Sequence, residues 1–220
     1  MVDVMRKRQN TVSSLLDGWN SPPNLVTYTR IALVIAFVVI DVMAGPWGAN
    51  SVTMRWVAAV LFIVAASTDK LDGWMARTYD QVTELGKLMD PIADKLLIGA
   101  TLVVASAFGE VYWWVTILML VREIGITVMR FFVIDTGGRV IAASRAGKYK
   151  TLAQCVGLGL LLFPVWSLSP SSAGTPMWIN VYYVVTFTVI YLSLILCLYS
   201  GGLYLYRVWR PASSDAATKA

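Results

Sequence analysis

The chain has 220 residues, of which 57% are hydrophobic and only 14% are charged, and its mean hydropathy is +0.65. These values exclude an ordinary soluble protein, which needs far more polar surface, and they are typical of an integral membrane protein. Histidine is absent. This excludes imidazole-based triads, metal sites and proton shuttles, so a general base has to be a carboxylate or, failing that, a Lys, Tyr or Cys.

The net charge of +5 comes from basic residues that lie in short clusters between apolar runs rather than on one polar domain. We therefore expect no nucleic-acid partner, because such clusters favour anionic membrane lipids and phosphorylated substrates. The two cysteines, Cys155 and Cys197, lie inside apolar runs without metal-ligand spacing. This predicts packed, unbonded thiols.

Residues 1–23 carry a basic cluster at 6–8, followed by apolar residues at helical spacing over 12–19. The pattern predicts a short amphipathic juxtamembrane helix on the cytoplasmic face, with a disordered tail as the alternative. No apolar stretch directly follows the basic cluster, so we expect no cleavable signal peptide.

Six apolar stretches follow, each about 20 residues long and so able to cross a bilayer as a helix. The predicted spans are 25–44, 54–76, 88–108, 111–134, 150–167 and 178–206. The start of the fifth span is uncertain, because Gln154 and Gly157 interrupt it. The predicted fold is an all-α integral membrane protein with six transmembrane helices in a domain at 24–207, followed by a polar cytoplasmic tail at 208–220.

Along the chain, loops that carry basic residues alternate with loops that carry none. They occur at both termini and in the second and fourth loops, whereas the loops at 45–53, 109 and 168–177 hold no Lys or Arg. Arg55, just inside the second span, is the only basic residue expected near the outer side of the membrane. The positive-inside rule therefore predicts a multi-pass protein of the inner (cytoplasmic) membrane with both termini in the cytoplasm. The second loop, and with it the active site, is expected on the same side, where nucleotides are available.

The second and third spans share an end that holds four aspartates. They are Asp69, Asp72, Asp90 and Asp94. On helices, the first two share one face and the last two share another. Four ionised carboxylates facing one another in a low-dielectric site repel strongly, so a neutralising partner is required. Two divalent cations would serve, and oxygen ligands suit Mg²⁺ or Mn²⁺.

Three of these aspartates each have a small residue one helical turn away. The small residues are Gly73, Ala76 and Gly86. They leave space for two helices and a ligand to approach closely. Arg77, two turns after Asp69, adds a planar fork suited to phosphate oxygens. Acids, metals and arginine together predict a site for a phosphorylated, metal-bridged substrate.

The pattern Asp-x2-Asp-Gly-x2-Ala-Arg-x8-Gly-x3-Asp-x3-Asp runs from Asp69 to Asp94 without a departure. It resembles the signature of the CDP-alcohol phosphotransferase family. The resemblance implies that the aspartates hold two metals, that Arg77 holds the diphosphate of CDP-diacylglycerol and that the small residues make room for the nucleotide. It also implies that Asp94 takes the proton from the acceptor hydroxyl. Acids that merely cap helix ends are the alternative. Family members are often homodimers, although no interface pattern is visible in this sequence.

Three further residues are assigned to CDP-diacylglycerol binding by the same resemblance. The sequence Pro-Asn-x2-Thr-x2-Arg, ending at Arg30, resembles the family's first-helix pattern and so points to Asn24 and Thr27. Capping of the helix by Asn24 is the alternative. Thr83 resembles a family position near the cytidine diphosphate.

The Asp90-Pro91 pair leaves two possibilities open for the third span. Proline is tolerated in the first turn of a helix, where Asp90 could cap it. Alternatively the helix begins earlier and is kinked, because the proline leaves the carbonyl of Lys87 without its donor.

Basic residues in the fourth and fifth spans suggest a second phosphate site. Arg122 lies about ten residues into the fourth span, deep enough that exposure to lipid would be costly. Glu123 is adjacent but is expected to point elsewhere. Arg130 returns to roughly the same side as Arg122, and Arg145 and Lys148 follow at the cytoplasmic boundary. Positive-inside topology and a helix–helix salt bridge are the alternatives.

This set, Arg-Glu-x6-Arg followed by Ala-Ser-x2-Gly-Lys-x-Lys-Thr, resembles the bacterial phosphatidylglycerophosphate synthases. The resemblance implies glycerol 3-phosphate as the acceptor and CMP as the leaving group. Inositol phosphate, or phosphatidylglycerol as in cardiolipin synthases, are alternative acceptors. An intramembrane prenyltransferase and a cation transporter are alternatives outside the family, and a transporter site would be expected near the midplane. The last span offers aromatics and leucines and is assigned to packing and lipid contact.

Overall fold

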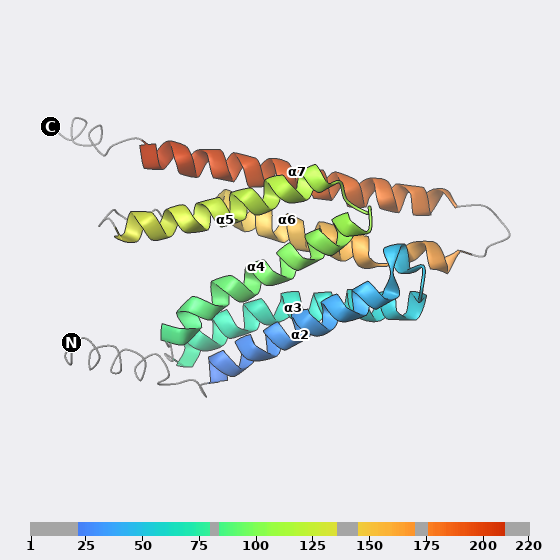
Figure 1. Cartoon of the computed structure of the whole chain (residues 1–220), viewed down its shortest axis with the longest axis horizontal. Helices are drawn as coiled ribbons and strands as arrows, with labels where there is room; N and C mark the ends of the chain where they lie inside the picture. Colours follow the sequence, from blue (N-terminus) through green and yellow to red (C-terminus); the bar gives the residue numbers. More distant parts are fainter. Residues whose placement is uncertain (1–21, 80–83, 136–144, 170–175, 210–220) are drawn as a thin grey trace, which may run out of the picture. The chain divides into compact units, whose positions relative to one another are not determined.

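The computed structural model describes residues 22–79, 84–135, 145–169 and 176–209. Within these ranges the chain forms six long helices: α2 (Pro22–Ala44), α3 (Val52–Tyr79), α4 (Glu84–Ala107), α5 (Trp113–Asp135), α6 (Arg145–Leu162) and α7 (Met177–Trp209). Two short 3-10 helices, η1 (Pro46–Gly48) and η2 (Val165–Leu168), follow α2 and α6 (Figure 1). The described residues contain no strand, so the all-α prediction is confirmed. The amphipathic segment expected before residue 22 and the tail after residue 209 lie outside the described residues.

Five of the six predicted spans agree with a helix to within a few residues at each end. The fifth differs, because α6 starts and ends five residues earlier than predicted. Gly157 does not interrupt α6: a Cβ there would lie 2.9 Å from the Ile190 side chain, so the glycine allows α6 and α7 to pack closely. The helix ends before Pro164, which has no N–H to continue it.

The two possibilities for Pro91 are also distinguished. Helix α4 begins at Glu84 and continues through Pro91, so the proline does not mark the helix start. The N–H that would bond to the Lys87 carbonyl is therefore missing within a helix, in the segment that carries Asp90 and Asp94.

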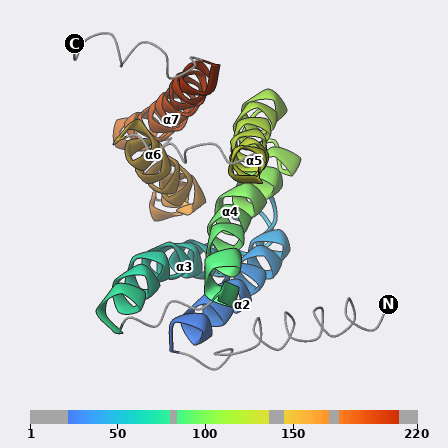
Figure 2. The same cartoon turned by 90° about the vertical axis from the view of Figure 1, so that its left-hand side faces the viewer.

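The chain divides into two compact units, residues 1–110 with 162–170, and residues 111–161 with 171–220. In the first unit α2 lies along α3 and also contacts α4 (Figure 1 and Figure 2). Helix α2 buries a narrow stripe whose members are three or four residues apart: Thr27, Arg30, Val34, Phe37, Asp41 and Ala44. Small residues of α3, including Ala58 and Ala65, are buried as well, and the rings of Phe37 and Phe62 lie 5.7 Å apart. Small side chains let the two helices approach closely.

The second unit is held together by contacts of α7 with α5 and α6. The rings of Trp114 and Tyr191 stack 6.1 Å apart, and the Tyr182 hydroxyl donates to the Leu160 carbonyl at 2.6 Å. Five buried positions of α7 again form a stripe with spacings of three and four: Thr186, Ile190, Ser193, Cys197 and Ser200. Several polar residues therefore face the interior of this unit.

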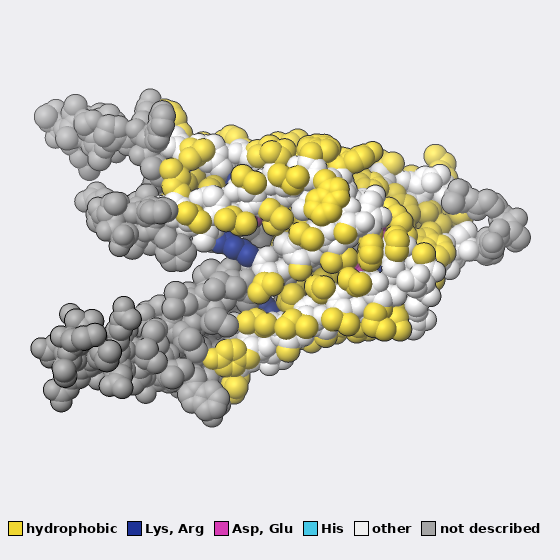
Figure 3. All heavy atoms as spheres, in the orientation of Figure 1, with side chains coloured by type: hydrophobic (Ala, Val, Ile, Leu, Met, Phe, Trp, Pro, Cys, Tyr) yellow, Lys and Arg dark blue, Asp and Glu magenta, His cyan; other side chains and the backbone are white. Residues whose placement is uncertain are grey.

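Large apolar side chains are exposed on the helices. Ile35, Val184 and Ile195 are 59%, 66% and 62% exposed, and Figure 3 shows apolar side chains spread over one face of the described residues with few charges among them. Helices α2 and α7 are long and apolar enough to cross a membrane, and the apolar parts of α3, α4 and α6 are shorter. Exposed apolar surface of this extent suits lipid rather than water.

Arg55, the exception in the charge pattern of the loops, is buried with two carboxylates of the first unit. Its Nη1 lies 2.8 Å from Asp41 Oδ1 and its Nη2 lies 2.6 Å from Glu110 Oε2. Its Nε donates to the Leu162 carbonyl at 3.1 Å. This arginine therefore links α2, α3, the end of α6 and the segment after α4, and its charge is neutralised internally.

The same network holds the turn between α2 and α3. Trp47 has a φ of 56°, in the left-handed region that non-glycine residues seldom adopt. Its N–H donates to Glu110 Oε1 at 2.7 Å, and its carbonyl accepts from Trp166 Nε1 at 3.1 Å. Two hydrogen bonds thus hold the strained residue in place.

Candidate active site

The four aspartates lie on two adjacent helices of the first unit. Helix α3 carries Asp69 and Asp72, and α4 carries Asp90 and Asp94. The two helices contact one another and run in opposite directions, joined by residues 80–83 (Figure 1). Both segments are helical, as the predicted sharing of faces requires. The side chains of the four aspartates lie outside the described residues.

The distances of the aspartates from the connection are matched. Asp69 lies ten residues before Tyr79, the end of α3, and Asp94 lies ten residues after Glu84, the start of α4. Asp72 lies seven residues before Tyr79, and Asp90 lies six residues after Glu84. In two antiparallel helices joined by a short connection, residues equally far from the connection lie at the same level. Counted along the chain, the four acids therefore form two pairs at matched distances from the connection.

This arrangement fits a pair of hard divalent cations, because such ions prefer carboxylate oxygens as ligands. Each of the two helices contributes two aspartates. Among the side chains that the structure describes, no group of three Asp, Glu, Cys or His is close enough to bind a metal. The motif aspartates are not part of that set. The aspartate-bearing hairpin thus remains the predicted metal site.

The first-helix pattern lies directly beside this hairpin. Thr27 and Arg30 of α2 are both about 1% exposed, and Arg30 Nε donates to Thr68 Oγ1 at 3.4 Å. Thr68 is the residue before Asp69. The contact therefore brings the start of α2 to the beginning of the acid segment. Arg30 is an additional residue of this region, and the signal for it in the sequence is its position three residues after Thr27, on the same helical face.

The other predicted nucleotide-site residues are placed by backbone alone. Asn24 lies in the first turn of α2, and the small residues and arginine of the motif lie on α3 and α4. These are Gly73, Ala76, Arg77 and Gly86. Their side-chain surroundings lie outside the described residues, as does Thr83 altogether.

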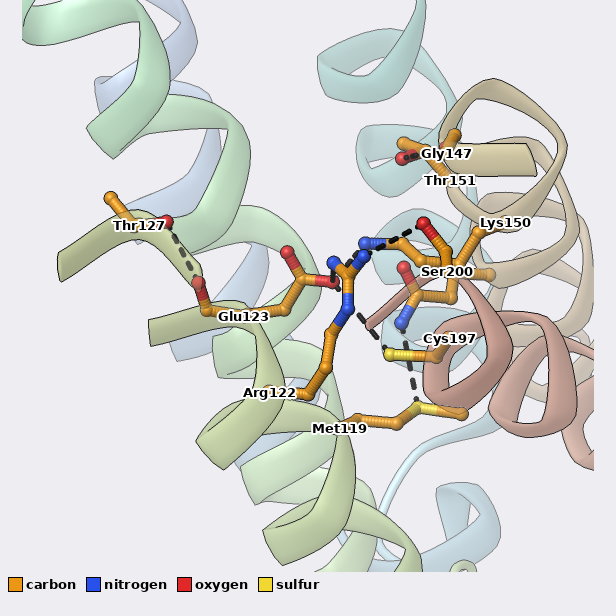
Figure 4. A network of polar contacts seen from close by, with 10 residues as sticks. Met119, Arg122, Glu123, Thr127, Gly147, Lys150, Thr151, Cys197 and Ser200 are labelled. Atoms are coloured by element: carbon orange, nitrogen blue, oxygen red, sulfur yellow. Dashed lines mark hydrogen bonds and ion pairs between the residues drawn. The ribbon is translucent and has the colours of Figure 1, made fainter. Parts of the chain in front are cut away.

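A polar cluster in the second unit surrounds Arg122 (Figure 4). Arg122 Nη1 lies 3.3 Å from Glu123 Oε1, and Arg122 Nη2 donates to Ser200 Oγ at 2.9 Å. Lys150 of α6 also pairs with Glu123 Oε1. The thiol of Cys197 lies 3.9 Å from the same oxygen. Neither cysteine forms a disulfide, as predicted.

The expectation that Glu123 points away from Arg122 is wrong. Neighbours on a helix diverge at the backbone, but both side chains are long enough to bend toward each other, and Lys150 provides a second cation for the carboxylate. The sequence could not reveal this, because Lys150 is 27 residues away.

Among the described residues of this cluster, positive charges outnumber negative charges. Two cations, Arg122 and Lys150, share the single carboxylate of Glu123, and Lys150 is only 5% exposed. Arg122 Nε is buried and has no hydrogen-bond partner among the described residues. Buried donors are normally satisfied, and an unpaired guanidinium N–H beside excess positive charge suits an anion such as phosphate.

The remaining basic residues of the predicted acceptor site lie on the same helices. Arg130 is eight residues after Arg122 on α5, and Arg145 and Lys148 lie in the first turn of α6. Their side chains lie outside the described residues, so convergence on Arg122 remains a prediction. Lys150, which the structure adds to the cluster, belongs to the same basic run of the sequence.

Exposed apolar helices, an acid-bearing hairpin and a buried cationic cluster define a helical membrane protein suited to phosphorylated substrates. Residues 20–199 match the sequence model of the family described as CDP-alcohol phosphatidyltransferase. The match covers most of the chain, and the chain belongs to this family.

Individual relatives agree with this assignment. The chain is 44% identical over 142 residues to the "Probable phosphatidylglycerophosphate synthase" of Mycobacterium tuberculosis H37Rv, covering 64% of this chain and 66% of the relative, just under two-thirds. It is 37% identical over 172 residues to the "CDP-diacylglycerol--glycerol-3-phosphate 3-phosphatidyltransferase" of Bacillus subtilis, covering 74% and 89%. The Escherichia coli K12 protein of the same name is 38% identical over 145 residues, covering 64% and 76%.

Proposed function

We propose that this protein transfers the phosphatidyl group of CDP-diacylglycerol to glycerol 3-phosphate, releasing CMP and forming phosphatidylglycerophosphate. The observation that supports the proposal is that the four motif aspartates lie in pairs on two contacting helices, at matched distances along the chain from the connection between them. The names of the relatives supply the substrates. A transferase of this kind takes part in phospholipid biosynthesis.

The aspartates would hold two Mg²⁺ or Mn²⁺ ions, which when bound supply charge stabilisation at the diphosphate and the leaving CMP. Arg77 binds the diphosphate, and Asn24, Thr27 and Thr83 lie near the nucleotide. The absence of large side chains at Gly73, Ala76 and Gly86 leaves room for it. Arg30, buried and in contact with Thr68, places a further positive charge next to the start of the acid segment.

The reaction forms one phosphorus–oxygen bond and breaks another. The acceptor hydroxyl oxygen bonds to the phosphorus that carries the diacylglycerol, and the bond from that phosphorus to the bridging oxygen of CMP breaks. Asp94 accepts the proton of the attacking hydroxyl. CMP leaves with the bridging oxygen and its charge.

The acceptor's own phosphate binds to the basic cluster of the second unit, consisting of Arg122, Arg130, Arg145 and Lys148. The unpaired Nε of Arg122 and the excess positive charge of the described cluster support this assignment. A phosphate oxygen would give the buried N–H its missing acceptor.

We also place the 24–207 domain in the inner (cytoplasmic) membrane, with six spans and with both termini and the active site on the cytoplasmic side. The exposed apolar faces of α2 and α7 support a lipid environment, and the basic residues of the loops support the orientation. The proposal includes a homodimer, and its only support is that members of the family are often homodimers.

The test is CMP release by the purified full-length protein from CDP-diacylglycerol with Mg²⁺ or Mn²⁺. Glycerol 3-phosphate should support release, and glycerol, which lacks the phosphate, should not. Inositol phosphate and phosphatidylglycerol test the alternative acceptors. Cation flux into proteoliposomes without CMP release would instead indicate a transporter. Absence of CMP release with every acceptor and both metals would refute the proposed function.

A further inference from the structure

The last helix contributes directly to the Arg122 cluster. The sequence predicts only packing and lipid contact for α7, but Ser200 lies on its buried stripe, is 5% exposed and accepts a hydrogen bond from Arg122 Nη2 at 2.9 Å. Figure 4 shows Ser200 and Cys197 of α7 on the side of the cluster opposite α5. The guanidinium of Arg122 is therefore held from two helices.

Gly201 determines how closely Arg122 lies against α7. A Cβ at this position would come within 3.1 Å of Arg122 Cγ and 3.4 Å of its Nε, closer than side chains ordinarily approach. It would also lie 3.7 Å from Ile126 Cδ1. Gly202 is different, because a Cβ there would meet no atom within 4 Å. The missing side chain of Gly201 thus gives the aliphatic part of Arg122 its place on α7.

These contacts fix one orientation of the guanidinium. Glu123 engages Nη1, Ser200 engages Nη2, and Gly201 accommodates the aliphatic part, while Nε remains without a partner. Nε belongs to the edge of the guanidinium that binds a phosphate oxygen in a fork geometry. A side chain restrained at three points loses less freedom when it binds a ligand.

We propose that Ser200 and Gly201 are positioning residues for Arg122, and that they make this part of α7 a wall of the binding site for the acceptor's phosphate. The inference rests on the proposed function. Both residues follow position 199, where the family match ends. They touch Arg122 rather than the substrate, so their effect should appear in acceptor affinity.

The test compares Ser200→Ala and Gly201→Ala in the full-length protein, with CMP release measured against each substrate in turn. Loss of a hydrogen bond to a charged group should raise the KM for glycerol 3-phosphate roughly tenfold in Ser200→Ala. Displacement of Arg122 should raise it by a similar factor, roughly tenfold, in Gly201→Ala. The KM for CDP-diacylglycerol should stay within about twofold of wild type, and so should kcat at saturating acceptor.

Each variant has a matched control on the same helix. Gly202→Ala adds the same methyl group where nothing is close. Ser193→Ala removes a buried hydroxyl that bonds to the carbonyl of Ile190 in its own helix, at 2.7 Å. Neither control should change the KM for either substrate. Thermal unfolding in detergent identifies a variant that is merely misfolded, and the isosteric Ser200→Ala keeps the test valid if Gly201→Ala does not fold.

The outcomes separate this inference from the function on which it rests. If the wild-type protein releases CMP with glycerol 3-phosphate but folded Ser200→Ala behaves as Ser193→Ala does, the positioning role is refuted and the proposed function stands. Equal rises in KM for both substrates would also refute it. If the wild-type protein uses only an acceptor without a phosphate, both the proposed acceptor and this inference fail.

Discussion

Two arginines, the buried Arg55 of the first unit and the largely buried Arg122 of the second, are surrounded very differently. Arg55 has two carboxylates and a carbonyl at hydrogen-bond distance, so each side of its guanidinium is occupied. Arg122 shares one carboxylate with Lys150, bonds one serine hydroxyl and leaves its buried Nε unpaired.

The difference separates a structural role from a binding role. A buried cation with full internal compensation holds helices together, and breaking such a pair leaves an uncompensated charge. A largely buried cation with incomplete compensation is costly in the free protein, and an anionic ligand can supply the missing acceptor. The number of acceptors around each arginine therefore predicts which substitution affects folding and which affects substrate binding.

The largest effect is expected for Arg55→Met. Removing the guanidinium leaves Asp41 and Glu110 buried beside each other without a cation, which should cost about 3–5 kcal/mol of stability. Thermal unfolding in detergent should show a large decrease in melting temperature and a poor yield of folded protein. A melting temperature equal to that of the wild type would mean that Arg55 does not hold the first unit together.

Arg122→Met should have the opposite profile. The substitution removes a charge that the protein compensates only in part, so the melting temperature should change little. The KM for glycerol 3-phosphate should rise by roughly a hundredfold, corresponding to the loss of about 2–3 kcal/mol from a charge-assisted contact. The KM for CDP-diacylglycerol serves as the internal control. A lower melting temperature with an unchanged acceptor KM would make Arg122 a second structural arginine.

The smallest effects are expected from the carboxylates that surround Arg55. Glu110→Gln should destabilise by about 1–3 kcal/mol, and Asp41→Asn by less. The order follows from geometry, because Glu110 accepts from both Arg55 and the strained Trp47, whereas Asp41 accepts only from Arg55 in the described contacts. Melting temperatures of the two variants give the order directly, and the reverse order would show that the Trp47 turn contributes little.

Much of the fold could be predicted from the sequence because the relevant signals are local. The apolar runs located the six long helices, and the spacing of the aspartates required helical backbone on both sides of residues 80–83, which the structure has. The end of α6 was misplaced because the apolar character continues beyond the helix into residues near Pro164. The sequence could not decide whether α4 starts at Pro91 or continues through it, because the same local pattern fits both alternatives.

The contacts that distinguish the two arginines could not be predicted, because they join distant parts of the chain. Arg55 and Glu110 are 55 residues apart, and Arg122 and Ser200 are 78 residues apart. In the sequence, Ser200 and Gly201 are small residues in an apolar run, a pattern typical of helix packing. Only the fold shows that they lie against a charged side chain.

The most direct test of the account is CMP release from CDP-diacylglycerol and glycerol 3-phosphate by Asp94→Asn, compared with the wild type and with Asp135→Asn, an aspartate outside the motif. Asparagine cannot accept the proton of the attacking hydroxyl, so Asp94→Asn should unfold at the wild-type temperature but release no CMP with Mg²⁺ or Mn²⁺. Asp135→Asn should retain activity. Near-normal CMP release by folded Asp94→Asn would contradict the assignment of Asp94 as the base and with it the proposed chemistry of the aspartate hairpin.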